Sequence, residues 1–330
     1  MKRKLFTLII AIMLLMCSNT AYAVEGTSDR NTLSDDNILS LTHYDVETGM
    51  ETKEVISVSE LQTHNALLRS QIRDTLQGEL TGYIPPLDTN SSTSGMSMPR
   101  TIFDGDSQSR VNVNNYPYSC VLYLRAGFDI NDDGVCERWF GGTGFLVGYD
   151  TMVTAGNIFI QTIDGVRRMV DQCRIYVRQA STSYGSTYYL PKNWTYSTVY
   201  MDEVNDEHDW IVATLSSPLG LENGYFAVRN WNLSIAGVTA TISGYPGSTS
   251  SKRYYQYQSS GPIRSYTTKR MSYLIDTEAG NSGSPIFISN NQVIGIHTGG
   301  GTQANWGMRI FEGLYAIIEN RRLAGEQLYG

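Results

Sequence analysis

Short runs of β-branched and aromatic residues, separated by turn-forming residues, recur along the chain from residue 101 onward. Runs of this length and spacing are typical of the strands of antiparallel barrels and sandwiches. We therefore expect an all-β body whose strands include the runs 120–128, 142–148, 173–179, 210–215, 238–245, 272–277, 285–289 and 292–298.

The last segment of the chain has a different period. Apolar residues at positions 314, 317, 318 and 323 recur at helical spacing. The pattern predicts one C-terminal α-helix over about 311–328.

The first 23 residues have the pattern of a bacterial signal peptide. Three basic residues precede the apolar run 5–16, and the small residues Ala21 and Ala23 offer a cleavage site. The run is short for a membrane span, and no second one follows. Cys17 would suit a lipoprotein, but Met16 stands where that signal needs a small residue. We expect a secreted protein that is not attached to a membrane after cleavage.

The acidity of the chain lies mostly in a leader segment. The whole chain carries a net charge of -7, with 32 acidic and 25 basic residues. Residues 24–100 hold 12 acidic and 5 basic residues, whereas 101–330 holds 20 and 17. The chain lacks the basic clusters that neutralise phosphates, so we expect no nucleic-acid partner.

The leader ends in a polar stretch, 87–100, of the kind found in exposed linkers. We predict that 24–100 is a propeptide and that an arginine-directed protease cuts after Arg100, so that the mature protein begins at Thr101. A solvated N-terminal extension is the alternative.

The motif GNSGSP, at 280–285, carries the chemistry. Glycines on both sides leave the Ser282 hydroxyl exposed, and the backbone N–H groups of Gly280 and Ser282 can point at one developing oxyanion. The blocks MVTAGN (152–157) and DWIVATL (209–215) lie upstream, in the chain order base, acid, nucleophile. The sequence predicts a nucleophilic serine.

Region 101–320 resembles the bacterial glutamyl endopeptidases, which are secreted serine proteases of the chymotrypsin fold. The resemblance implies two antiparallel β-barrels, at about 101–225 and 235–310, with the active site between them. Among the matching blocks are DSQSRVNVNNYPYSCV (106–121), GTGFLVG (142–148), STYYLPKNW (186–194), TISGYPG (241–247), DTEAGNSGSPIF (276–287) and GIHTGG (295–300).

The resemblance also assigns roles to single residues. Ser282 matches the nucleophile, Asp209 the triad carboxylate, and Gly280 with Ser282 the oxyanion donors. The family holds a Glu side chain before the scissile bond, because several donors or a cation can offset the desolvation of a buried anion. The residues that match this acid-binding pocket are Thr277, His297, Thr298 and Gly299.

The chain departs from the family at the base. The family has TAGHC where this chain has TAGNI, so Asn157 stands in the histidine position and Ile158 in the position of a cysteine. Gly142 stands where the partner cysteine is expected. An amide has no basic lone pair near neutral pH, so Asn157 cannot take a proton from Ser282. We expect turnover to fall by about 10⁴ to 10⁶.

No other histidine is a good substitute. His43 and His64 belong to the leader, and His297 belongs to the predicted pocket. His208 precedes Asp209 on a strand, so it should point away from the cleft. Three accounts stay open: a natural pseudoprotease that binds acidic peptides, a deliberately inactivated form, and an active enzyme with another base.

Residues 129–134 match part of a calcium-binding motif. Asp129, Asn131 and Asp133 match the first half of a calcium loop, but Phe140 stands where a bidentate Glu belongs. We expect a hairpin turn and no cofactor there.

The mature part also has an odd number of cysteines, which allows at most one bridge and leaves the pairing open. These are Cys120, Cys136 and Cys173. We expect a monomer.

Overall fold

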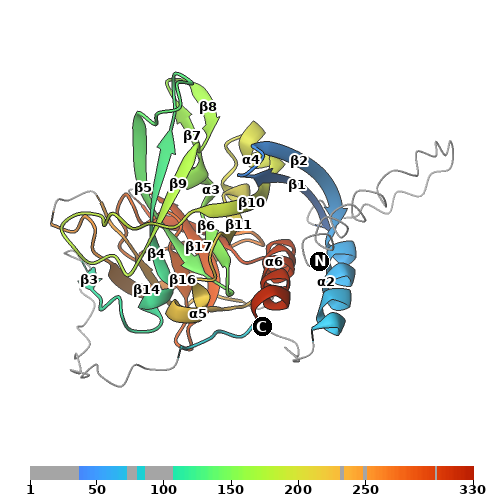
Figure 1. Cartoon of the computed structure of the whole chain (residues 1–330). Coiled ribbons are helices and arrows are strands. Elements are labelled where there is room, and N and C mark those ends of the chain that lie inside the picture. The colour runs from blue at the N-terminus through green and yellow to red at the C-terminus, as the bar shows by residue number, and fades with distance from the viewer. Residues whose placement is uncertain (1–36, 73–79, 86–106, 231–233, 248–250, 302) are drawn as a thin grey trace. The chain divides into compact units, whose positions relative to one another are not determined.

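The computed structural model describes residues 37–72, 80–85, 107–230, 234–247, 251–301 and 303–330 (Figure 1). The predicted signal peptide, the polar stretch 87–100 and the junction between Arg100 and Thr101 lie outside the described residues.

The first sheet contains six antiparallel strands from the N-terminal half of the predicted mature part. Strand β4 (Val121–Phe128), which lies between β5 and β9, is buried along almost its whole length, which explains its near-continuous apolar sequence. The strands follow the order β10-β11-β6-β5-β4-β9. Their bounds are β4 (Val121–Phe128), β5 (Arg138–Leu146), β6 (Thr151–Thr154), β9 (Gln172–Val177), β10 (Pro191–Ser197) and β11 (Ile211–Leu215); β7 (Ile160–Ile163) and β8 (Val166–Met169) form a separate hairpin.

The second sheet closes into a six-stranded barrel, because β17 pairs with both β16 and β18. Isoleucines from several of its strands fill the interior. The circle runs through β13 (Thr239–Gly244), β14 (Tyr257–Tyr266), β15 (Arg270–Tyr273), β18 (Asn305–Arg309), β17 (Gln292–Gly300) and β16 (Pro285–Phe287); β12 (Ala227–Val228) pairs with β17 and β3 (Ser109–Arg110) with β14.

The C-terminal helix α6 (Glu312–Tyr329) lies where the apolar period predicts it. Leu314, Ile317, Ile318 and Leu323 are all buried. The predicted all-β fold with a C-terminal helix is confirmed. Short helical turns connect the strands: η2 (Tyr118–Cys120), α3 (Gly156–Phe159), α4 (Thr198–Asp202), η3 (Asp206–His208) and α5 (Gly220–Asn223).

The described part of the leader segment is also folded, which the sequence patterns did not predict. Strand β1 (Ile38–Asp45) pairs with β10 and with β2 (Met50–Ser57), so the first sheet gains two strands. Helix α2 (Val58–Gln71) begins with a capping box between Ser57 and Glu60. The prediction of a single long helix therefore holds only for the part after residue 101.

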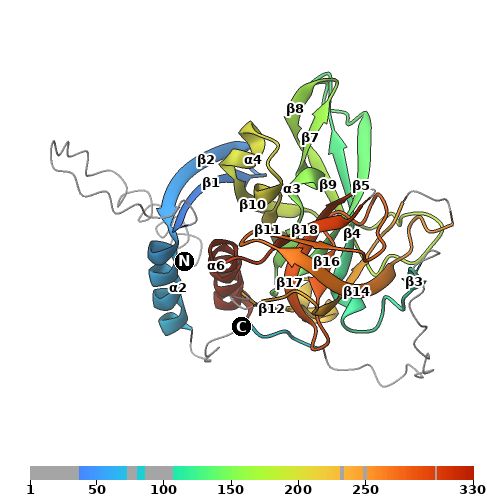
Figure 2. The same ribbon diagram turned by 180° about the vertical axis from the view of Figure 1, so that it is seen from behind.

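Helices α2 and α6 lie side by side in both views (Figures 1 and 2). The buried amide of Asn65 donates to the carbonyl of Ala316, at 2.9 Å, and to a carboxylate oxygen of Glu319, at 3.0 Å. Its oxygen accepts a hydrogen bond from Asn320. Arg69 forms an ion pair with Glu319. The leader therefore makes specific polar contacts with the C-terminal helix.

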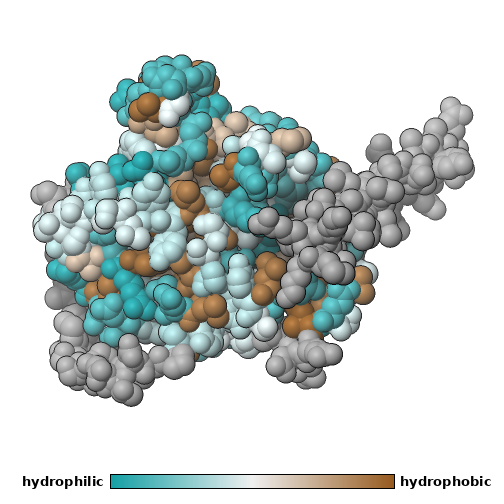
Figure 3. Space-filling view, in the orientation of Figure 1, coloured by the Kyte–Doolittle hydropathy of each residue, from teal (hydrophilic) through white to brown (hydrophobic). Residues whose placement is uncertain are grey.

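Among the described residues, no helix is both long and apolar enough to cross a membrane. On the face of the molecule shown in Figure 3, hydrophobic residues are scattered among hydrophilic ones. Scattered apolar residues are usual on a protein surface and do not mark an interaction site.

Candidate active site

Ser282 lies in a turn that only glycines can build. Gly280 and Gly283 have φ angles of +100° and +84°, in the region that side chains avoid. A Cβ on Gly280 would lie 2.4 Å from the carbonyl oxygen of Tyr245, and one on Gly283 would lie 1.9 Å from that of Thr143. The glycines of the GNSGSP motif are therefore required by the backbone.

Thr143, on β5, fixes this turn from the other sheet. Its N–H donates to the carbonyl of Ser282 at 2.9 Å, and its hydroxyl donates to the carbonyl of Gly280 at 2.9 Å. The same hydroxyl oxygen accepts the N–H of Tyr245 at 3.0 Å. Thr143 was not predicted as a site residue, although it belongs to the block GTGFLVG.

The turn leaves its predicted reactive groups available. Within the described part of the chain, the N–H groups of Gly280 and Ser282 have no hydrogen-bond acceptor, and the Ser282 hydroxyl has no partner. Acyl transfer needs a serine hydroxyl as the nucleophile and backbone donors that bind the oxyanion. This turn leaves both free.

Asn157, at the start of α3, is held by hydrogen bonds to Asp209 and Thr298. Its N–H donates to one carboxylate oxygen of Asp209 at 2.7 Å, and its side-chain amide donates to the other at 2.9 Å. The same amide donates to the carbonyl of Thr298 at 2.7 Å. The structure thus brings Asn157 and Asp209 together, as the motif order predicts.

Asp209 is buried, with 3% of its surface exposed. Burial raises the pKa of its carboxyl from 3.8 to about 7, against the hydrogen bond from the Asn157 backbone, which lowers it. The nearby Asp206 raises the pKa further. The hydrogen bonds from Asn157 therefore offset only part of the cost of burying this carboxylate.

Ile158 and Gly142 face each other across α3 and β5. A Cβ on Gly142 would lie 2.3 Å from Cδ1 of Ile158. These are the two positions at which the family resemblance implies a disulfide. The isoleucine side chain fills the space beside the glycine instead.

His297, which is predicted to belong to the acid-binding pocket, is buried. Nδ1 of His297 lies 2.8 Å from the hydroxyl of Tyr273. Burial lowers the pKa of His297 to about 3, although a hydrogen bond to the Trp306 backbone opposes that shift. The ring is therefore uncharged at neutral pH.

Thr298 is another residue predicted to belong to this pocket. Its Oγ1 is buried and has no hydrogen-bond partner within the described part of the chain. Thr277 is half-buried before the serine turn. A Cβ on Gly299 would lie 2.8 Å from the indole of Trp306, so glycine is needed for this ring to pack against the strand.

The other histidines bond elsewhere. His208 lies 2.7 Å from the hydroxyl of Ser197, and His43 contacts Thr195 and Glu54. His64 lies in α2. None of the hydrogen bonds to Asp209 or Asn157 within the described chain comes from a histidine.

The loop at 129–134 is an Asp-rich turn. The Asp129 carboxylate accepts the N–H groups of Asn131, Asp133 and Gly134. Carboxylate oxygens of Asp129, Asp133 and Glu137 lie within 4.8 Å of one another. The hydrogen bonds explain the turn, and the expectation that no calcium binds there stays a prediction.

The three cysteines of the predicted mature part are free thiols. Cys120 and Cys173 are buried, and burial raises the pKa of Cys173 to about 12. A thiol that stays protonated is a weak nucleophile. The one bridge that the sequence permits is not formed.

Comparisons with known proteins agree with this geometry. The family model described as trypsin matches residues 106–314, more than half of the chain. The chain belongs to the trypsin family and is a trypsin-like serine protease by fold.

Two curated relatives and one solved structure are similar to this chain. A glutamyl endopeptidase of Bacillus licheniformis is 29% identical over 237 residues, which cover 67% of this chain and 69% of the relative. An extracellular metalloprotease of Bacillus subtilis is 25% identical over 233 residues, with the same shares. The structure of a Glu endopeptidase in complex with MPD has a TM-score of 0.57 at 22% identity and covers 67% of this chain and 99% of that one. The predicted resemblance to glutamyl endopeptidases is confirmed.

Proposed function

We propose that this chain is a secreted protein of the serine-protease fold that binds acidic polypeptides and cleaves them very slowly. The observation that carries this proposal is the hydrogen bonding of Asn157. Its amide donates to Asp209 and to Thr298, so the residue in the histidine position offers only an amide oxygen for proton transfer.

The reaction that the serine turn would support is acyl transfer. Ser282 would attack a peptide carbonyl, and the N–H groups of Gly280 and Ser282 would bind the oxyanion. Asp209 has no imidazole to orient, so the proton of the Ser282 hydroxyl has no acceptor of suitable basicity. The remaining rate would come from the oxyanion donors and from binding, as in triad variants of other serine proteases.

The acid preference is supported by the donors around the pocket. The Thr298 hydroxyl is unpartnered, and Thr277 supplies a second hydroxyl before the turn. His297 is uncharged at neutral pH, so it would act with Tyr273 as a hydrogen-bonding group of the pocket and not as a counter-ion. Hydrogen bonds would then offset the desolvation of a Glu carboxylate.

The test compares the secreted chain with its Asn157→His variant on a peptide with one internal Glu. Restoring the imidazole should raise kcat/KM by about 10³-fold or more, because a base then stands between Asp209 and Ser282. Asn157→Gln is the matched control, since it changes the side chain without adding a base. A fluorophosphonate probe should label Ser282 faster in the histidine variant.

Two results would count against the proposal. If the natural chain cleaves as fast as Asn157→His, another base operates and the protein is an active enzyme. If Ser282 resists the probe even in the histidine variant and acidic peptides do not bind, the domain is a structural one.

Secretion and maturation form part of the proposal. The signal pattern at 1–23 and the arginine before Thr101 both support export followed by cleavage. N-terminal sequencing of the larger chain, separated from fragment 24–100 under denaturing conditions, should begin at Thr101, and a start far from that residue would contradict processing at Arg100.

A further inference from the structure

A pocket of about 440 Å³ adjoins the serine turn at Ala279 and Gly280. Gly141 of β5 forms another part of its rim. None of the four residues of the predicted acid-binding pocket lines it. A peptide whose acidic side chain occupies that first pocket would place the residues that follow the attacked bond near Gly280, and so beside this second pocket.

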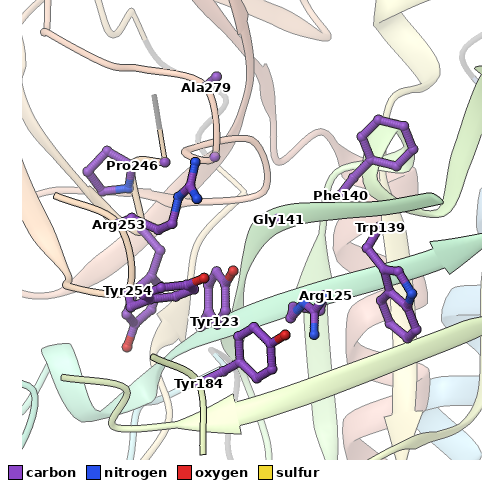
Figure 4. A pocket seen from close by; sticks show the side chains of 13 residues that line it. Tyr123, Arg125, Trp139, Phe140, Gly141, Tyr184, Pro246, Arg253, Tyr254 and Ala279 are labelled. Carbon is purple, nitrogen blue, oxygen red and sulfur yellow. The ribbon is translucent and has the colours of Figure 1, made fainter. Parts of the chain in front are cut away.

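Aromatic rings and two arginines line the second pocket. Figure 4 shows Arg125 between the rings of Tyr184 and Trp139. The guanidinium carbon lies 4.0 Å from the first ring centroid and 4.6 Å from the second. Stacking on both faces orients the guanidinium plane and leaves its N–H donors at the edges.

Arg125 and Arg253 have no carboxylate partner in the described part of the chain, and the pocket lining contains no acidic residue. Burial raises the pKa of Tyr123 to about 12, while both arginines act to lower it. Both positive charges therefore act on Tyr123 in the lining of this pocket, in a chain whose net charge is -7.

A third arginine adds to this positive charge. Arg174 on β9 lies directly opposite Arg125 on β4, and its guanidinium carbon is 4.5 Å from the Trp139 ring. Like charges directly opposite each other destabilise a sheet. The stacking on Trp139 offsets part of this repulsion, and a bound anion would offset more.

We propose that this second pocket binds a carboxylate side chain on the part of the polypeptide that follows the bond facing Ser282. The ligand is then acidic on both sides of that bond. A carboxylate matches the fork of an arginine guanidinium, and the aromatic walls supply apolar contact for the side-chain stem. The inference rests on the proposed function, since it takes its direction from a peptide that crosses Ser282.

The test is equilibrium binding of fluorescent peptides to the full chain, measured by anisotropy in a Ser282→Ala background that prevents cleavage. One peptide carries a Glu before the bond and a second Glu after it, moved through the first three following positions. Its partners replace either Glu with Gln. Replacing the following Glu at its best position should weaken binding by about 10-fold or more.

Arg125→Gln should cause the same loss for the peptide with two Glu residues and leave the peptide with the following Gln unchanged within twofold. Arg253→Gln, a change at an exposed residue that should not affect folding, should give a smaller loss with the same selectivity. Arg138→Gln is the matched control, because this arginine is exposed on β5 and does not line the pocket.

The inference is overturned if the following Glu keeps its full advantage in the double variant of Arg125 and Arg253. It is equally overturned if Arg138→Gln weakens binding as much as Arg125→Gln. If the affinity depends only on the Glu after the bond, the second pocket is supported and the proposed acid-binding pocket is contradicted. If the affinity depends only on the Glu before the bond, the acid-binding pocket is supported and the second pocket is contradicted. If no peptide binds, both are contradicted.

Discussion

The contact between Gly142 and Ile158 explains how single residues reshape the neighbourhood of the site. Ile158 Cδ1 would lie 2.3 Å from a Cβ at position 142, so a side chain there and the isoleucine exclude each other. The family resemblance points to these two positions as the sites of a missing disulfide. Only the structure shows that the isoleucine occupies the space between them.

Gly142→Ala should lower the free energy of unfolding by about 1 to 3 kcal/mol, because the new methyl group overpacks the site. Ile158→Ala in the same chain should recover part of this loss by removing Cδ1. Urea denaturation of the two single variants and the double variant measures the coupling. Additive effects would mean that the two side chains do not compete for this space.

Asp209 and His297 should have opposite effects on the pH dependence of stability. The folded-state pKa of Asp209 is raised from 3.8 to about 7, so its contribution to stability is lost as pH rises through that range. The folded-state pKa of His297 is lowered from 6.5 to about 3, so its contribution is lost as pH falls through that range. The two slopes oppose each other between about pH 4 and 6.

The His297→Gln variant should reveal the Asp209 slope. Without the histidine, the change of unfolding free energy with pH should become more negative by about 1.4 kcal/mol per pH unit between pH 4 and 6. Glutamine keeps a hydrogen-bonding partner for Tyr273. Urea denaturation at several pH values in this range provides the measurement, and parallel curves for the two proteins would show that His297 titrates normally.

At the scale of elements, the edge strand β10 is the position where the leader joins the fold. β1 pairs with β10 from Leu41 opposite Ser197 to Asp45 opposite Asn193. An unpaired strand edge presents free N–H and C=O groups, and the leader satisfies them here. Helix α2 then contacts α6 through the buried Asn65.

Asn65→Ala should weaken the docking of α2 by about 1 to 3 kcal/mol, because it leaves the partners of a buried amide without hydrogen bonds. Hydrogen exchange should show faster exchange in 58–71 and little change in the barrel strands. Gln62→Ala serves as the control, since Gln62 also contacts α6 but makes only one exposed hydrogen bond there, to Glu312. Equal effects of the two variants would show that burial of Asn65 does not matter.

Several elements were not predictable from the sequence. β14 reads YQSSGPIRSY and is only partly buried, so it lacks the apolar alternation of an obvious strand, yet it pairs with both β13 and β15. β2 is exposed over most of its length and is defined by its pairing with β1. In both cases, hydrogen bonding to neighbouring strands selects a conformation that local propensity does not.

For the whole molecule, the docked leader predicts the behaviour of the cleaved protein. After cleavage between Arg100 and Thr101, fragment 24–100 should remain bound to 101–330, because β1 and α2 keep their contacts with β10 and α6. Size-exclusion chromatography with light scattering should then give a mass near that of one chain, 36.8 kDa, less the signal peptide. Separate elution of the leader would contradict this prediction, and a doubled mass would contradict the expected monomer.

The sequence by itself determined the all-β class, the C-terminal helix and the serine turn, because these depend on periodicity and on glycines that the backbone requires. It also identified Asn157 and Asp209, because the resemblance to the glutamyl endopeptidases assigns those two positions. Only the tertiary structure decided the roles of residues that act through distant partners. Thr143 fixes the serine turn from another sheet, and Arg125 lies opposite Arg174 on the neighbouring strand. The leader pairs with the edge of β10, which is far from it in sequence. Such contacts depend on which strands become neighbours, and local patterns do not encode that choice.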